Sequence, residues 1–240
     1  MGDGSFYEEM KTLVDHHGAI NNPYLDRFAI GRIEQEEFPR FAFEFYQFSR
    51  FFPRILVTQL VNTEDEEVAA ELTRVLFSEL GDGDPRKRHE LLYRDFLRSV
   101  GLDVGEAIRQ PMLPSTRAYI KGMEHLYSSP NRFTALGASF GLENMAIAMW
   151  DHLIPGLRIA KERWYPRMDT TYFTFHRELE DSHEEAMERA LAAEADAMAA
   201  KEKRDFRQGT VKVLDYLEGF WMGLEARRVD VPLLAAARAA

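Results

Sequence analysis

The spacing of apolar residues constrains the fold of this chain more than any other feature. Apolar residues recur three and four positions apart along almost its whole length. No stretch alternates apolar and polar residues between turn signals, as a half-buried strand would require. Because the first pattern is typical of amphipathic helices, the sequence predicts an all-α protein, which we take as a single domain over residues 1–240.

The limits of the expected helices follow from the turn signals. The clearest break is the stretch from Gly81 to Pro85, where Asp84 can cap a new helix and Pro85 suits its first position. Another break is expected at Pro155-Gly156. The predicted helices span residues 5–17, 34–62, 65–80, 86–100, 114–128, 131–152, 169–204 and 208–227.

Composition excludes several classes of function. The chain contains no cysteine, which rules out disulfides, thiolate metal sites and thiol nucleophiles. Its formal charge of -10 is made of interspersed acids and bases, so we expect no nucleic acid partner. No apolar run approaches the roughly 20 residues of a membrane span, and Met1 to Asp15 lacks an apolar leader core. We therefore expect a cytoplasmic protein that does not bind membranes.

Six acidic and imidazole side chains lie within or at the end of apolar stripes on four predicted helices. Such positions face a protein core, where an isolated ionised carboxylate is costly unless it is paired or bound to a cation. On the 169–204 helix, three of them follow one face at i, i+4 and i+7. The six residues are Glu79, His89, Glu143, His176, Glu180 and His183.

Three carboxylates and three imidazoles are enough to hold two divalent ions inside a helical bundle, with positions left open for O2 and substrate. A ligand set without sulfur suits iron or manganese, and zinc or copper could occupy it in vitro. Simpler interpretations remain open at this stage. Glu79 could be solvated at a helix end, His89 could donate to a carbonyl, Glu143 could pair with a buried arginine, and Glu180 could belong to a charged surface.

The order and spacing of these residues resemble a known family. The matching segments are Phe45-Tyr46-Gln47-Phe48 followed by Phe52-Pro53, then Glu79 to Pro85 with His89, then Glu143, then His176-x3-Glu180-x2-His183. From about Asn22 to Glu218 the chain resembles the haem-oxygenase-like di-iron oxidases and oxygenases.

The resemblance implies a haem-oxygenase-like bundle of about seven core helices. It also implies two iron ions, ferrous for O2 activation, with Glu79, His89, Glu143, His176, Glu180 and His183 as ligands. Many members have aspartate at the position of Glu180, so the carboxylate of this chain reaches one methylene further and the resemblance does not fix how it binds. The implied reaction is oxidation of a small amino-acid-like or carboxylic-acid substrate by N-oxygenation, desaturation, oxidative decarboxylation or C–C cleavage. A homodimer is one assembly that we consider.

Relatives of the same fold supply alternative functions. A thiaminase-like mechanism is excluded because this chain has no cysteine. A metal-free oxidase of the quinone-cofactor-synthase type would leave the buried carboxylates unexplained, and a non-catalytic helical binding protein is a further alternative. Haem binding would need His16 or His17 as an axial ligand and Gly137 and Gly141 beside the porphyrin. We interpret these two glycines instead as a site of close helix packing.

An aromatic stripe is a candidate for the walls of a substrate cavity, although its members suit a plain hydrophobic core equally well. Two tyrosines nearby are candidate polar groups at the end of these walls. The stripe consists of Phe38, Phe41, Phe45, Phe48 and Phe52, and the tyrosines are Tyr46 and Tyr93.

Overall fold

The computed structural model describes residues 5–179 and 197–228, and every regular element in these ranges is helical. The helices are α1 (Phe6–Asp15), α2 (Pro23–Ala29), α3 (Phe38–Val61), α4 (Glu66–Glu79), α5 (His89–Ser99), α6 (Val104–Arg109), α7 (Pro114–Tyr127), α8 (Arg132–Arg163) and α10 (Ala200–Ala226). A further helical segment covers residues 171–179. The all-α prediction is confirmed.

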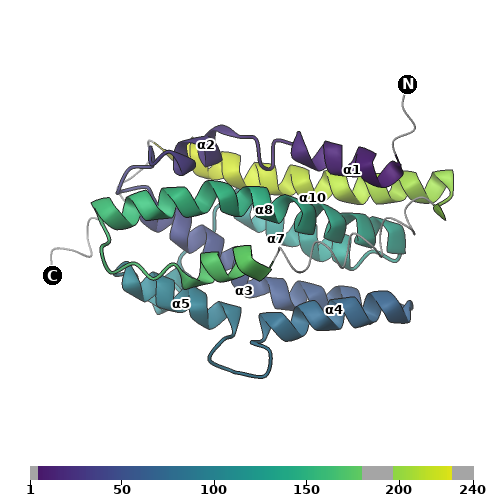
Figure 1. Ribbon diagram of the computed structural model, residues 1–240, viewed down its shortest axis with the longest axis horizontal. Helices are drawn as coiled ribbons and strands as arrows, with labels where there is room; N and C mark the ends of the chain where they lie inside the picture. The colour runs from purple at the N-terminus through teal and green to yellow at the C-terminus, as the bar shows by residue number, and fades with distance from the viewer. Residues whose placement is uncertain (1–4, 180–196, 229–240) are drawn as a thin grey trace.

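The helices form a bundle in which α10 packs mainly on α8 and α7, while α3 contacts α7, α4 and α5 (Figure 1). Figure 1 shows α4 and α5 on one side of the bundle and α1, α2 and α10 on the other. The long helix α8 lies between them and contacts α2, α7 and α10. This arrangement places the ends of α4 and α5 within reach of the inward face of α8.

Close approach of α8 and α10 depends on glycine. An ideal Cβ at Gly137 would lie 2.0 Å from the carbonyl oxygen of Phe206, and one at Gly209 would lie 2.0 Å from that of Thr134. The Thr210 hydroxyl donates to the carbonyl of Gly137 across the same contact, at 2.9 Å. The interpretation of Gly137 and Gly141 as packing residues is confirmed, because Gly141 also faces α10, at Val213 and Thr210.

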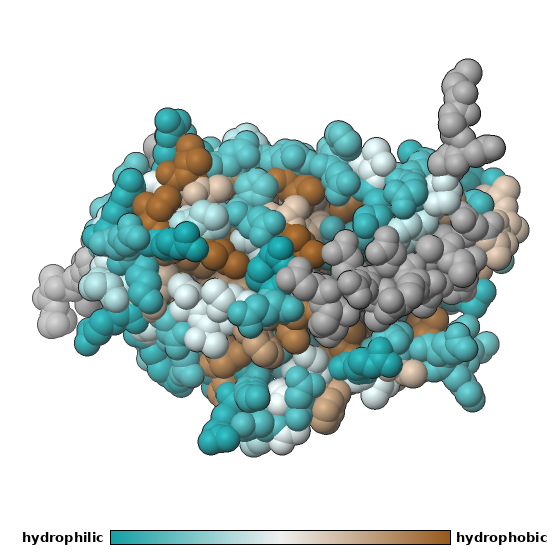
Figure 2. All heavy atoms as spheres, viewed as in Figure 1, coloured by the Kyte–Doolittle hydropathy of each residue, from teal (hydrophilic) through white to brown (hydrophobic). Residues whose placement is uncertain are grey.

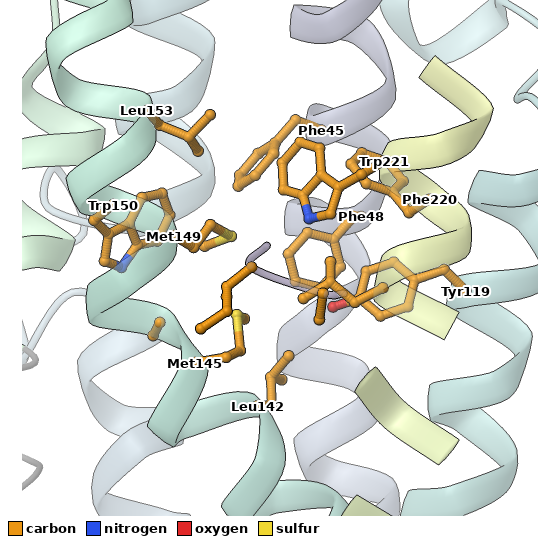
Figure 3. Close-up of a cluster of buried hydrophobic side chains, with 14 of the residues drawn as sticks. Phe45, Phe48, Tyr119, Leu142, Met145, Met149, Trp150, Leu153, Phe220 and Trp221 are labelled. Carbon is orange, nitrogen blue, oxygen red and sulfur yellow. The ribbon is translucent and has the colours of Figure 1, made fainter. Parts of the chain in front are cut away.

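The core of the bundle is aromatic and centres on α3. The ring of Phe45 lies within 6.5 Å, between centroids, of rings on α5, α8, α10 and the 171–179 segment. Figure 3 shows Leu142, Met145 and Met149 of α8 beside the aromatic rings contributed by α3, α7 and α10. Because so many helices meet at one ring, α3 fixes the positions of the elements around it.

Several predicted helix limits are wrong, among them the start predicted at residue 34, since α3 begins at Phe38. The predicted break at Pro155-Gly156 is absent, because α8 continues through Pro155 to Arg163. Gly156 serves close packing instead, since a Cβ there would lie 2.1 Å from the carbonyl oxygen of Phe28. The break predicted between 204 and 208 is also absent, because α10 runs unbroken from Ala200, where the Glu202 carboxylate accepts from the Ala199 N–H at 2.7 Å.

The start of the helix predicted at residue 86 is also wrong, because α5 begins at His89. Asp84 does not cap that helix, since its Oδ1 accepts from the backbone and side chain of Arg86. Two short helices, α2 and α6, were not predicted. Each begins after a polar cap, in which Asn22 accepts from Leu25 N–H at 3.0 Å and Asp103 from Glu106 N–H at 2.8 Å.

In the described ranges no helix is long and apolar enough to cross a membrane. The face in Figure 2 is largely hydrophilic, with apolar residues in scattered groups between polar ones.

Candidate metal centre

Three of the six predicted ligands meet in the interior of the bundle. Glu79 is the last residue of α4, His89 is the first residue of α5, and His176 lies on the 171–179 segment. Nδ1 of His89 lies 3.1 Å from Oε1 of Glu79, and Nε2 of His176 lies 3.9 Å from the same oxygen. One ligand atom from each residue fits in a group whose members all lie within 4.8 Å of one another.

The turn between α4 and α5 brings Glu79 and His89 together. Gly81, Asp82 and Gly83 all have positive φ, which is costly for most residues and easy for glycine. A Cβ at Gly81 would lie 2.3 Å from the carbonyl oxygen of Asp84, so this position requires glycine for space as well as for conformation. The loop therefore returns the chain from the end of α4 to the start of α5.

A backbone contact orients the ring of His176. Its Nδ1 lies 2.6 Å from the carbonyl oxygen of Tyr172, and because a carbonyl only accepts, Nδ1 carries the proton. The lone pair of Nε2 then faces Glu79. The pKa of His176 is lowered to about 4, first by burial and then by the nearby His89. At neutral pH the ring is therefore uncharged, which is the form that binds metals.

His89 is only 3% exposed, and although its Nδ1 lies 3.1 Å from the Glu79 carboxylate, neither ring nitrogen makes a hydrogen bond. Its ring centroid lies 4.4 Å from that of His176. A buried polar nitrogen without a partner is costly and calls for a ligand, an ion or a water molecule. The structure therefore does not support the alternative in which His89 donates to a carbonyl.

Glu143 of α8 faces the same cavity as Glu79. Burial, followed by repulsion from Glu79, raises the pKa of Glu143 to about 7. Two acids that share one cavity are destabilising unless a proton or a cation lies between them. Glu180 and His183, the other two predicted ligands, lie outside the described residues, so their part in the site stays a prediction.

A cavity of about 70 Å³ adjoins these residues. Its walls are largely apolar, and its polar members other than the predicted ligands are Ser49, Ser78 and Tyr172. The Tyr172 hydroxyl donates to Ser49 Oγ at 3.2 Å. Sequence reasoning did not select these three residues, although Tyr172 lies one turn before His176 on the same helix face.

The aromatic stripe divides between the cavity and the core. Phe48 and Phe52 line the cavity, whereas Phe38, Phe41 and Phe45 are packed in the core. Tyr46 and Tyr93 are buried, but neither lines the cavity. Their hydroxyls point elsewhere, because Tyr46 donates to Glu90 and Tyr93 donates to the carbonyl of Ala42.

The histidines of the first helix are not placed for haem. His16 is exposed, and its Nδ1 lies 2.8 Å from the carbonyl of Thr12. His17 accepts from the Ala19 N–H at Nδ1, and its Nε2 faces Asp215 at 3.4 Å. With Glu218, His17 and Asp215 form a second group of possible ligands, but this group lies at the surface with both His17 nitrogens engaged.

A family model described as iron-containing redox enzyme matches residues 40–218 of this chain. This span includes every residue of the buried cluster. The chain belongs to the iron-containing redox enzyme family. The family resemblance inferred from the sequence motifs is thereby confirmed, and the family is one of redox enzymes described as iron-containing.

Individual relatives agree with this membership. The chain is 26% identical to 4-chloro-allylglycine synthase of Streptantibioticus cattleyicolor over 219 residues, which cover 91% of this chain and 82% of the relative. Among solved structures, a CADD-like protein of unknown function from Nostoc punctiforme has a TM-score of 0.74 at 16% identity, over 93% of this chain and 97% of the other.

A TenA homologue from Pseudomonas syringae pv. tomato has a TM-score of 0.73 at 13% identity, over 92% of this chain and 90% of the other. A domain of unknown function from Shewanella denitrificans, described as having a heme oxygenase-like fold, has a TM-score of 0.64 at 18% identity. It matches 93% of this chain and 88% of that domain. At these identities the comparisons establish the fold, which is haem-oxygenase-like.

Proposed function

We propose that this member of the iron-containing redox enzyme family is a non-haem di-iron enzyme that uses O2 to oxidise a small amino-acid-like or carboxylic-acid substrate. The observation that carries the proposal is the convergence of Glu79, His89 and His176, drawn from three different helices, beside a cavity that Glu143 also lines. Glu180 and His183 complete the proposed ligand set.

The residues present fit iron. Two imidazole nitrogens and a carboxylate oxygen converge, and the chain offers no thiolate that would favour a softer metal. His89 has two buried nitrogens without hydrogen-bond partners, and His176 has its Nδ1 fixed on a backbone carbonyl, as metal-binding histidines commonly do. The pKa of Glu143 is raised, and a cation bound between Glu143 and Glu79 would lower it by stabilising the ionised carboxylates. Manganese would satisfy the same donors.

When bound, the iron would supply the activation of O2 and the redox equivalents of the reaction. The chain contributes ligand geometry and a largely apolar cavity beside the reacting groups. The hydrogen bond from Tyr172 to Ser49 holds one polar wall in place. Tyr172 also fixes His176 through its backbone carbonyl, so the same residue shapes the cavity and orients a ligand.

The substrate class is the finer part of the proposal. A relative named 4-chloro-allylglycine synthase, similar over 91% of this chain, supports an amino-acid-like substrate. The cavity of about 70 Å³ is small, which favours a compact side chain at the reacting position. The proposed reaction belongs to the group of N-oxygenation, desaturation, oxidative decarboxylation and C–C cleavage.

Metal loading tests the ligand assignment. Metal-free protein should take up close to two ferrous ions under anaerobic conditions, measured by elemental analysis after removal of free iron. His176→Ala and Glu143→Gln should lower that value. His17→Ala is the matched control, because it removes a histidine from the surface group with Asp215 and Glu218 and should leave loading unchanged. Wild-type protein that takes up no iron would refute the proposal.

Oxygen consumption tests the reaction. The iron-loaded protein should consume O2 faster with one member of a panel of L-amino acids and short fatty acids than without substrate. His89→Ala should lose this response, whereas His17→Ala should retain it. Normal iron loading without oxidation of the ferrous ions by O2, with or without the panel, would leave a metal-binding protein and contradict the enzymatic function.

A further inference from the structure

Three buried tyrosines form a continuous line that starts at the metal centre. The ring of His176 lies 4.2 Å from that of Tyr172, measured between centroids. Tyr172 lies 4.7 Å from Tyr93, and Tyr93 stacks on Tyr46 at 5.6 Å. The three tyrosines are at most 4% exposed. Neighbouring rings in the line are thus close enough for an electron to pass between them.

The line ends at the surface on a carboxylate. The Tyr46 hydroxyl donates to Oε1 of Glu90 at 2.6 Å and accepts from Nε of Arg94 at 3.2 Å. The side chains of Glu90 and Arg94 are 28% and 34% exposed. Tyr46 is itself fully buried, but its hydroxyl contacts the side chains of Glu90 and Arg94, which reach solvent.

The partners of the three hydroxyls differ in a way that matters for oxidation. A tyrosine that loses an electron becomes a strong acid, so the resulting radical is stable only where a base takes the phenolic proton. Tyr172 donates to the hydroxyl of Ser49, and Tyr93 donates to the carbonyl of Ala42, neither of which is an effective base. Tyr46 alone in this line donates to a carboxylate.

We propose that Tyr172, Tyr93 and Tyr46 form a one-electron relay that carries oxidising equivalents from the metal centre to the surface at Glu90. The proposal rests on the proposed function for its oxidant, which is the one-electron oxidant that arises when iron at the centre reacts with O2.

In the net step, Tyr46 loses one electron and its O–H bond breaks. The electron passes through Tyr93 and Tyr172 and reduces the oxidant by one electron, while the proton moves to the Glu90 carboxylate. The products are a neutral tyrosyl radical at Tyr46 and a protonated Glu90. Tyr93 and Tyr172 return to their starting state, and a small reductant in solution, such as ascorbate, can restore Tyr46 by donating one electron while the proton returns from Glu90.

The relay would protect oxidisable side chains that line the cavity. Met145, Met149 and Trp150 line it, and these side chains are readily oxidised. When no substrate occupies the cavity, an oxidant formed there would attack them. Transfer of the oxidising equivalent to Tyr46 moves it away from these residues to a position where a soluble reductant can remove it.

Electron paramagnetic resonance tests the relay. Ferrous protein mixed with O2 without substrate and then frozen rapidly should give a tyrosyl radical signal. Tyr46→Phe should abolish it or change its hyperfine pattern, and Tyr93→Phe should reduce it several-fold. Tyr119→Phe is the matched control, because Tyr119 is equally buried, its hydroxyl has no hydrogen-bond partner and it does not line the cavity.

Peptide mass spectrometry gives an independent readout. After the same reaction, Tyr93→Phe should accumulate several-fold more oxidation at Met145, Met149 and Trp150 than wild type or Tyr119→Phe. Circular dichroism should confirm that each variant is folded. Consumption of ferrous iron by O2 with no tyrosyl signal, or with the same signal in Tyr46→Phe, would overturn the relay and leave the proposed function intact.

A metal-free arm separates the two proposals. Photogenerated tris(bipyridine)ruthenium(III) in solution should oxidise the metal-free protein to a tyrosyl radical that is lost in Tyr46→Phe and retained in Tyr119→Phe. A signal that does not depend on Tyr46 would overturn its assignment as the end of the relay, whether or not the protein binds iron. Failure to bind iron with a Tyr46-dependent signal would instead count only against the proposed function.

Discussion

Two glycines of α10 should respond in opposite directions to the same substitution. Gly209 packs against the backbone of α8, whereas Gly219 is exposed and has no atom within 4 Å of the position that a Cβ would take. Both lie within α10, between Ala200 and Ala226, so the helix stability gained when alanine replaces glycine is the same at both positions. That gain is about 0.5–1 kcal/mol in a helix interior.

The cost at Gly209 follows from distance. A Cβ there would lie 2.0 Å from the carbonyl oxygen of Thr134, whereas ordinary contact begins at 3.4 Å, so α8 and α10 would have to separate by roughly the difference. Overpacking of this kind costs about 1–3 kcal/mol. Separation would also strain the hydrogen bond from Thr210 to the Gly137 carbonyl, worth about 1 kcal/mol.

We therefore expect Gly209→Ala to lower the free energy of unfolding by about 2 kcal/mol, and Gly219→Ala to raise it by up to about 1 kcal/mol. In a chain of 240 residues, each kcal/mol corresponds to a change in Tm of about 2–4 °C. Urea titrations followed by circular dichroism, with thermal melts, would measure both. Equal stability of the two variants, or destabilisation by Gly219→Ala, would refute the packing argument.

Three further predictions address the site and its surroundings. In metal-free protein, the raised pKa of Glu143 means that its ionisation opposes folding. This cost to the free energy of unfolding is absent below about pH 4.5 and complete above about pH 7. In urea titrations, Glu143→Gln should therefore be more stable than wild type by up to about 3 kcal/mol at pH 8, but not at pH 4.5. Arg27 contacts the largely buried Glu37 at 3.1 Å and Glu225 at 2.9 Å, so Arg27→Ala should cost about 3–5 kcal/mol of unfolding free energy, and a loss below about 1 kcal/mol would contradict this. Added haem should form no stoichiometric complex with a sharpened Soret band, and a complex lost in His16→Ala or His17→Ala would reverse that conclusion.

Much of the candidate site could be predicted because acidic and imidazole side chains on apolar stripes are conspicuous. Glu79, His89, Glu143 and His176 were each selected because a polar side chain in a core stripe needs a partner, and the structure brings all four to one cavity. Ser78 and Trp150 line the same cavity but were not selected. A serine or a tryptophan on a helix is common and carries no such signal.

Helix limits were predictable only where local chemistry decides them. The limits of α4 and α7 follow from residues next to them, and the predicted spans of 65–80 and 114–128 agree with Glu66–Glu79 and Pro114–Tyr127 to within one residue at each end. The break predicted at Pro155-Gly156 is wrong because Gly156 acts in packing between helices and does not end one. Gly156 is small so that α2 can approach, and α8 tolerates the proline within it.

By itself, the sequence determined the all-helical class and the candidate ligands, because the period of apolar residues and the cost of buried charge are properties of short segments. Only the tertiary structure decided which faces meet. It brings Glu79 of α4 next to His176, 97 positions later in the chain. It also places Tyr93 between Tyr172, which it meets edge to face, and Tyr46, on which it stacks, a line of rings drawn from three separate segments. Such contacts depend on how helices cross, and crossing is set by the packing of many side chains together.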